Sequence, residues 1–255
     1  MNDATTLTSS EIDELNLRFA DAQPQEVLAW ALERFQPRIA LSSSFGVEDV
    51  ALIDMIAKIS PDAKIFTLDT LRLHTETYAV IDDIRARYSN EVIAYYPDMN
   101  VVDRMVKEHG YNCFYNSVDE RKLCCGVRKV EPLERALKDL DAWISGLRRD
   151  QAATRTSVQR IEIDEVHHGM IKLNPLADWT SDQVWDYVRA NEVPYNRLHD
   201  RGFPSIGCSP CTRPVRPDED PRAGRWWWEL DPEQKECGIH VGYDLGLITA
   251  QNRST

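Results

Sequence analysis

Short apolar runs alternate with amphipathic segments over residues 24–145 of the chain. Four apolar runs predict buried strands, and they lie at residues 38–46, 64–69, 91–96 and 142–145. Apolar residues at helical spacing predict helices at residues 24–35, about 48–60, 74–88, 101–109 and about 127–140. Strands that alternate with helices of this length are typical of βαβ units. The pattern therefore predicts an α/β fold with a parallel sheet covered on both faces.

The second half of the chain has a different pattern. Thr180–Gln183 has the sequence of a capping box and predicts the start of a helix. Beyond Pro194 the chain is rich in proline, glycine and arginine and shows little periodicity, and this segment contains the C-x-x-C pair Cys208–Cys211. A long irregular segment is easier to understand if a metal centre holds it. We predict a single domain over residues 1–255, with a C-terminal tail from about residue 229 to 255.

Composition narrows the class of protein. With 42% hydrophobic and 28% charged residues, the chain resembles an ordinary soluble globular protein. No apolar run approaches the roughly 20 residues that span a membrane, and no secretory signal is recognisable, so we expect a cytoplasmic protein without a membrane partner. The net charge of −12 opposes binding to nucleic acid. Basic residues nevertheless gather near cysteines or on nearby motifs, at residues 121–129, 148–155 and 213–225, which predicts a small anionic ligand.

Four of the six cysteines form two pairs that predict a metal centre. Cys124 and Cys125 are adjacent, and Cys208 and Cys211 form the C-x-x-C pair, so the two pairs supply enough thiolates for one centre. A chain of this size does not need disulfides to hold its core. Zinc sites usually take C-x-x-C-type spacings from both halves, whereas a cluster offers separate irons to adjacent thiolates. The pattern favours one [4Fe–4S] cluster, with zinc as the second interpretation and buried free cysteines as the third.

The other two cysteines have different surroundings in the sequence. Cys237 has Lys235, Gly238 and His240 as near neighbours, which is a poor sequence for a core. Nearby cations favour the thiolate, which is the nucleophilic form, and glycine leaves the sulfur accessible. We therefore predict that Cys237 is a nucleophile. Cys113 is flanked by large aromatic residues and is predicted to serve packing.

The turn Ser42–Gly46 follows the first predicted strand, where a phosphate-binding loop would lie. Backbone N–H groups, serine hydroxyls and the positive end of the next helix all favour an anion there. The turn has neither the Walker A spacing nor the Ser-Gly-Gly-x-Asp sequence of enzymes that split ATP to pyrophosphate. The turns after Asp69 and Ser145 are expected at the same edge of the sheet, so this edge is the predicted ligand site.

Five motifs of the chain together resemble the assimilatory adenylyl-sulfate reductases, the iron–sulfur branch of the phosphoadenylyl-sulfate reductase family. The resemblance runs from about Ser42 to His240. It implies an adenine nucleotide α-hydrolase-like fold, which is an ATP-pyrophosphatase-type α/β sandwich with a parallel sheet. The motifs are Cys124–Lys129, Ser145–Gln151, Gly207–Arg213, Arg222–Trp228 and Lys235–His240.

The resemblance also implies a reaction. Cys237 would attack the sulfur of adenosine 5′-phosphosulfate, release AMP and keep a thiosulfonate. Thioredoxin, or a glutaredoxin-like dithiol, would then release sulfite for cysteine biosynthesis, and the cluster would organise the electrostatics of the site. By motif, the phosphosulfate would contact Lys129, Arg222, Arg225 and His240, and the nucleotide pocket would be shaped by Ser42, Ser43, Ser44, Gly146 and Arg155.

The chain departs from the family pattern in one turn, and several alternatives stay open. Leu71 and Thr75 stand where the family usually has glycine and proline, and the glycine is expected to permit a positive φ. A reductase for 3′-phosphoadenylyl sulfate, or for both nucleotides, would use the same mechanism. A tRNA thiolation enzyme would need the Ser-Gly-Gly-x-Asp loop, and a cluster-bearing redox sensor would leave Cys237 unexplained. The sequence also leaves a homo-oligomer open.

Overall fold

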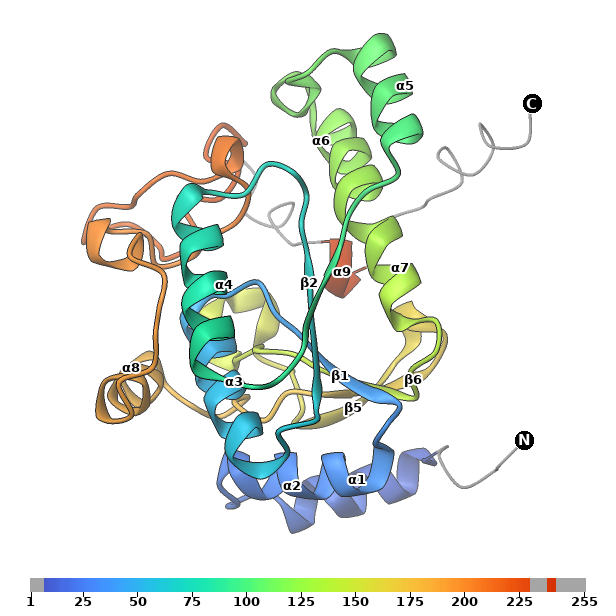
Figure 1. Ribbon diagram of the computed structural model, residues 1–255, viewed down its shortest axis with the longest axis vertical. Helices are drawn as coiled ribbons and strands as arrows, with labels where there is room; N and C mark the ends of the chain where they lie inside the picture. Colours follow the sequence, from blue (N-terminus) through green and yellow to red (C-terminus); the bar gives the residue numbers. More distant parts are fainter. Residues whose placement is uncertain (1–6, 230–237, 242–255) are drawn as a thin grey trace.

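The computed structural model describes residues 7–229 and 238–241 of the chain. In this part of the chain, six strands form one sheet in the order β3-β2-β1-β4-β6-β5 (Figure 1). Neighbouring strands pair in parallel, except that β5 is antiparallel to β6 at one edge. The predicted α/β class is confirmed. The strands are β1 (Ile39–Ser42), β2 (Lys64–Leu68), β3 (Val92–Tyr95), β4 (Ala142–Ile144), β5 (Ile161–Asp164) and β6 (Met170–Leu173).

The helices agree with the sequence pattern in most places. The described helices are α1 (Ser9–Arg18), α2 (Pro24–Phe35), α3 (Val47–Ile59), α4 (Thr75–Arg87), α5 (Met99–His109), α6 (Val118–Cys125), α7 (Glu131–Leu137), α8 (Ser181–Ala190) and α9 (Gly238–Val241). The capping box of α8 forms, because Thr180 and Gln183 exchange hydrogen bonds of 3.3 and 2.8 Å.

The predicted bounds of the helix at about residues 127–140 are wrong. The structure has a π-helical turn at Gly126–Val130, and α7 follows with Pro132 in its first turn. Proline fits a first turn because its missing N–H has no partner there. The strands β5 and β6 and the helix α6 were not predicted.

Successive residues along each central strand point to opposite faces of the sheet, and both faces are buried. Ile39 and Leu41 point into the larger core, which α2, α3, α4 and α8 cover. Ala40 and Trp143 point into a smaller core on the other face, where α7 packs. Both faces are therefore covered, as a parallel sheet requires. The carboxyl ends of the central strands stay open between these layers.

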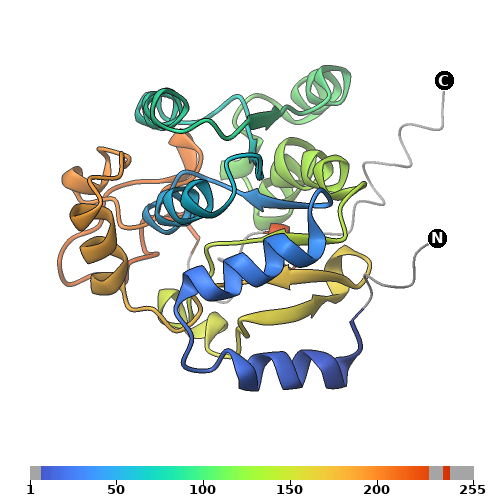
Figure 2. The same cartoon turned by 60° about the horizontal axis from the view of Figure 1, so that its bottom comes forward.

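The edge strand β5 is protected by the N-terminal helix. Figure 2 shows α1 running beside this strand. The side-chain amide of Asn16 donates to the Ile161 carbonyl at 2.8 Å and accepts from the Ile161 N–H at 3.1 Å. These bonds use backbone groups that an open edge would expose.

A third buried cluster lies away from the two sheet cores. In Figure 1, α5 and α6 lie at the opposite end of the molecule from α1 and α2. Apolar residues of α5 and α6 pack there with Phe114, Cys211 and Trp226. The described helices include none that is both long and apolar enough to cross a membrane.

Candidate active site

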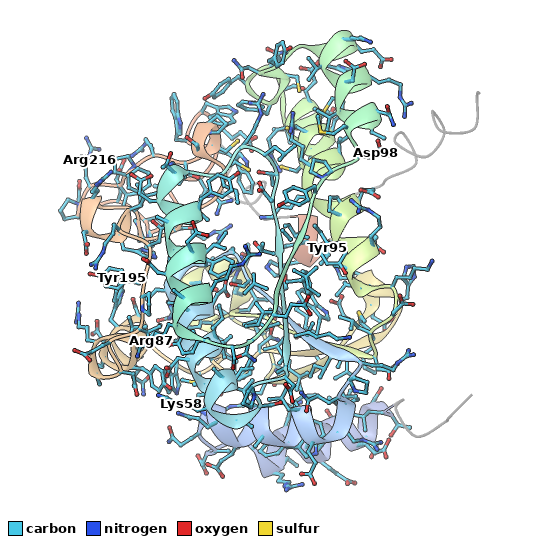
Figure 3. The ribbon with its side chains drawn as sticks, viewed as in Figure 1. Lys58, Arg87, Tyr95, Asp98, Tyr195 and Arg216 are labelled. Atoms are coloured by element: carbon cyan, nitrogen blue, oxygen red, sulfur yellow. The ribbon has the colours of Figure 1, made fainter. Side chains whose placement is uncertain are left out.

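A cavity of about 860 Å³ opens at the carboxyl ends of β1, β2 and β4. Its wall continues over the segment after α8, where Tyr195 and Arg216 are labelled in Figure 3. The structure brings together all nine residues that were predicted to contact substrate. Those lining residues are Ser42, Ser43, Ser44, Lys129, Gly146, Arg155, Arg222, Arg225 and His240. Their individual roles remain predictions.

The serine turn after β1 is held by a carboxylate of the same chain. Asp49 accepts the Ser44 N–H at 2.6 Å and the Ser44 hydroxyl at 2.8 Å. Burial raises the pKa of Asp49 to about 6, although the hydrogen bonds from Ser44 oppose the rise. The Ser44 N–H that was expected to meet an anionic ligand therefore already has an anionic partner. Sequence reasoning missed Asp49, whose only signal was an acid in the first turn of α3.

Gly146 gives Asp49 its space. A Cβ at position 146 would lie 2.4 Å from Asp49 Oδ1 and 3.0 Å from Glu48 Cβ. The loop after β4 is also tied to α3, because Arg148 donates to Glu48 Oε1 at 3.0 and 2.9 Å. The two turns that line this side of the cavity are therefore built as one unit.

Arg225 reaches the cavity from the segment after the C-x-x-C pair. Its guanidinium lies 4.9 Å from the centroid of the Trp226 ring and donates to the Ile206 carbonyl at 3.3 Å. Its buried Nε has no hydrogen-bond partner among the described residues. Gly207 makes the approach possible, since a Cβ there would lie 2.5 Å from the guanidinium. A buried cation with an unused donor is suited to an anionic ligand.

His240 is a neutral group among cations. Its ring is stacked on Trp143, with 6.1 Å between centroids and an interplanar angle of 11°. Burial lowers the pKa of His240 well below its ordinary value, and the charges of Lys172, Arg155 and Lys129 add to the effect. Its buried Nδ1 has no partner in the described part of the chain.

Cys124 and Cys211 are buried in one cluster beside the cavity, and the partly buried Cys125 and Cys208 pack against it. Cys124 and Cys125 end α6, and Cys208 and Cys211 flank a short turn that packs against it. Cys208 also lines the cavity, and its sulfur lies 3.1 Å from the Thr70 hydroxyl. No disulfide joins any of the five cysteines that the structure describes.

The burial of these thiols and the charges near them bear on whether they could bind a metal. Burial raises the pKa of Cys211 to about 12, while the charges of Arg225, Arg72 and Arg121 act in the opposite direction. Burial therefore favours the uncharged form of the Cys211 thiol. Within residues 7–229 and 238–241, no three His, Cys, Asp or Glu side chains are placed to hold a single metal ion. Cys113, predicted to serve packing, is buried in the same cluster.

Leu71 adopts the conformation that the family's glycine is expected to permit. Its φ is 60°, and its N–H donates to Asp69 Oδ1 at 2.8 Å. Thr75 is the first residue of α4, a position that also suits proline. Threonine is therefore compatible with the backbone of this turn, whereas leucine occupies it at the cost of backbone strain.

Cys237, the predicted nucleophile, lies outside the described residues. The structure resumes at Gly238 with α9, and this helix carries His240 into the cavity. The position of Cys237 relative to the cations of the cavity is therefore not described.

Known proteins are similar to this chain in sequence. Over 204 residues the chain is 52% identical to the adenosine 5′-phosphosulfate reductase of Burkholderia cepacia, covering 80% of this chain and 81% of the relative. It is 46% identical over 237 residues to the protein of that name from Pseudomonas aeruginosa (strain LESB58), covering 91% and 87%.

Solved structures agree with the fold. The phosphoadenylyl-sulfate reductase of Candida auris, a phosphate complex, has a TM-score of 0.71 at 34% identity, with 82% of this chain and 98% of that chain covered. A flavin mononucleotide adenylyltransferase of Candida glabrata has a TM-score of 0.54 at 14% identity, covering 98% and 86%, which shows a shared fold alone. Residues 38–214 match the phosphoadenosine phosphosulfate reductase domain. With this match across most of the chain, the protein belongs to the phosphoadenosine phosphosulfate reductase family.

Proposed function

We propose that the protein reduces adenosine 5′-phosphosulfate to sulfite and AMP in assimilatory sulfate reduction. The observation that carries the proposal is the cavity in which the motif residues meet, including Lys129, Arg225 and His240. The curated relatives of 46–52% identity named above carry the name of this activity. The cations suit a ligand with two adjacent anionic groups, and the sheet edge suits a nucleotide.

The proposed reaction begins at Cys237. Its thiolate attacks the sulfur of the phosphosulfate, the bond from sulfur to the phosphate oxygen breaks, and AMP leaves with that electron pair. A thiosulfonate then remains on the enzyme. Thiolate and substrate repel each other, so the cations on the cavity wall are needed to offset the negative charge as they approach.

An external dithiol completes the cycle. One thiolate of thioredoxin, or of a glutaredoxin-like protein, attacks the Cys237 sulfur, and sulfite leaves with the electron pair of the broken S–S bond. The second thiol of the partner resolves the mixed disulfide, so the partner supplies both electrons. This chemistry needs a reducing compartment such as the cytoplasm, in accord with the free thiols among the described cysteines.

The proposal includes one [4Fe–4S] cluster on Cys124, Cys125, Cys208 and Cys211. Four thiolates bind separate irons of such a cluster, so the sulfurs do not have to converge on one point as they would around a single zinc ion. The cluster with its thiolates carries net negative charge, which fits the arginines whose charges act on Cys211. When bound, it would supply a fixed charge beside the cavity, while the thiols carry the electrons.

The test is a single-turnover experiment on the cluster-loaded enzyme. Adenosine 5′-phosphosulfate without reductant is expected to give stoichiometric AMP and a mass increase of about 80 Da on Cys237. Reduced thioredoxin is expected to remove the adduct as sulfite. Cys237→Ser is expected to form no adduct and to retain its iron. An adduct on Cys113, or full turnover by Cys237→Ser, would contradict the mechanism.

A second candidate substrate is 3′-phosphoadenylyl sulfate, alone or together with the unphosphorylated nucleotide. It is favoured by the Candida auris relative, whose name includes this substrate. The discriminating measurement is kcat/KM for sulfite release with each nucleotide under the same conditions. A higher value with the 3′-phosphorylated nucleotide would replace the first assignment.

A further inference from the structure

A buried histidine outside the cavity lining is held between two hydrogen-bond acceptors. His167 is 2% exposed. Its Nδ1 lies 2.9 Å from Glu134 Oε1, and its Nε2 lies 3.0 Å from the carbonyl oxygen of Ile239. A carbonyl oxygen and a carboxylate only accept hydrogen bonds, so both ring nitrogens have to donate. His167 is therefore doubly protonated and positively charged when both bonds are made.

The charges around His167 favour this form. Burial alone would lower the pKa of His167, but the bonds to Glu134 and Ile239 and the charge of Asp164 outweigh it and raise the pKa. The pKa of Glu134 is lowered, first by its bond to His167. The exposed His168 also approaches Glu134, at 3.5 Å. Lys172 on β6 forms an ion pair with Glu162 on β5, with 3.0 Å between Nζ and Oε1.

His167 is joined to His240 by two routes. The first is the main chain, because Ile239, whose carbonyl His167 holds, immediately precedes His240 in α9. The second is Trp143, whose ring meets His167 edge-on at 5.8 Å and stacks on His240. Asp164 fixes this arrangement, since it accepts the Trp143 Nε1–H at 3.0 Å and the His167 N–H at 3.3 Å.

We propose that His167 is a positioning residue whose imidazolium holds α9 in place, and so sets His240 in the cavity and anchors the chain directly after Cys237. The link to catalysis rests on the proposed function. The anchoring itself does not, because it depends only on the contacts of His167. As pH rises through the raised pKa of His167, the remaining proton stays on Nδ1, because the Glu134 carboxylate is a stronger acceptor than a carbonyl. The Nε2–H bond to Ile239 is then lost, and the anchor weakens. Below that pKa the anchor is complete.

Two substitutions of His167 distinguish the hydrogen bond made by Nδ1 from the one made by Nε2. The amide of His167→Asn can replace the Nδ1–H toward Glu134, but it does not reach Ile239. The longer amide of His167→Gln can replace the Nε2–H toward Ile239 and cannot titrate. His168→Asn is the matched control, because His168 is adjacent, is 88% exposed and makes no bond to α9 in the described residues.

The first measurement is hydrogen exchange of the amides at residues 238–241 in the cluster-loaded enzyme at neutral pH. His167→Asn is expected to exchange about tenfold faster there than His168→Asn, the effect of one lost charge-assisted hydrogen bond. His167→Gln is expected to stay near wild type. After correction for intrinsic exchange, wild type is expected to lose protection with rising pH, and His167→Gln is expected to show no such transition. Equal exchange in His167→Asn and His168→Asn, or equal loss in both His167 variants, would overturn the proposal.

The second measurement is kinetic. His167→Asn is expected to lower kcat/KM for adenosine 5′-phosphosulfate about tenfold, with AMP affinity and iron content unchanged, and His167→Gln is expected to restore most of it. If wild type fails to turn over this nucleotide, the proposed function fails, while the exchange experiment still decides whether His167 anchors α9. If turnover is normal but exchange at α9 is insensitive to His167→Asn, the anchor is refuted and the proposed function stands.

Discussion

Replacing Gly146 by alanine tests whether the Asp49 carboxylate builds the nucleotide side of the cavity. The new Cβ would lie 2.4 Å from Asp49 Oδ1. Ordinary contacts between heavy atoms lie near about 3.5 Å, so the carboxylate has to move by about 1 Å. A shift of this size disrupts at least one of the bonds from Ser44, which are 2.6 and 2.8 Å long.

The size of the effect follows from the charge of Asp49. At neutral pH the carboxylate is mainly ionised, because its raised pKa is about 6. Losing one hydrogen bond to a buried charged group costs roughly 1.5–3 kcal/mol. For a chain of this size, about 2 kcal/mol corresponds to a melting temperature lowered by roughly 4–8 °C. Affinity for AMP is expected to fall about tenfold, because Ser44 and Gly146 line the same cavity.

Gly46 supplies the matched control. It lines the same cavity, but a Cβ there would meet its nearest neighbours at 3.7 Å, and its φ of −68° suits any residue. Gly46→Ala is expected to change stability by less than about 1 kcal/mol, the cost of alanine at a helix N-cap. Thermal melts and AMP titrations of the two variants are the assay. Equal effects of the two substitutions, or an unchanged affinity in Gly146→Ala, would refute the role assigned to Asp49.

Three further predictions concern other parts of the structure. Arg225→Ala is expected to lower kcat/KM for adenosine 5′-phosphosulfate roughly 10- to 100-fold at unchanged iron content, and normal kinetics would place the anion elsewhere. Arg121→Leu breaks the buried ion pair with Glu229, whose Nε–Oε1 distance is 2.9 Å, and is expected to lower the free energy of unfolding by about 3–5 kcal/mol. The double variant Arg121→Leu, Glu229→Leu is expected to regain most of this stability, which thermal melts of both variants would measure. Leu71→Gly is expected to be more stable than Leu71→Ala by about 1 kcal/mol, because only glycine adopts a φ of 60° without strain, and the reverse order in melts would contradict this.

The elements that the sequence predicted well are those with one clear periodicity. The central strands are short apolar runs, and α2 begins and ends at the predicted residues because Pro24 starts a strong apolar stripe. The edge strand β5 was not predicted because its alternation of apolar and acidic residues extends over only the four residues Ile161–Asp164. Its antiparallel pairing with β6 is a local hairpin, with Asp164 opposite Met170, but both strands are only four residues long.

The cavity residues were predicted from motifs, whereas the groups that hold them were not. The bond from His167 to Glu134 joins residues 33 positions apart, and the one to Ile239 joins residues 72 positions apart. Nothing near His167 in the sequence distinguishes it from the exposed His168. The role of Asp49 was also not visible in the sequence, because its raised pKa is caused mainly by its burial in the folded chain. Such roles arise from tertiary contacts, so only the folded chain reveals them.

The charge of the protein shows how far folding can reverse a property of the sequence. The chain carries a net charge of −12, which by itself would repel a nucleotide bearing a phosphosulfate. Lys129, Arg155, Arg222 and Arg225 nevertheless line one cavity and come from segments nearly a hundred residues apart. Within a partly dry cavity, nearby charges act more strongly than distant surface charges that salt screens. An anion in this part of the cavity is therefore close to several cationic side chains, although the chain as a whole is acidic.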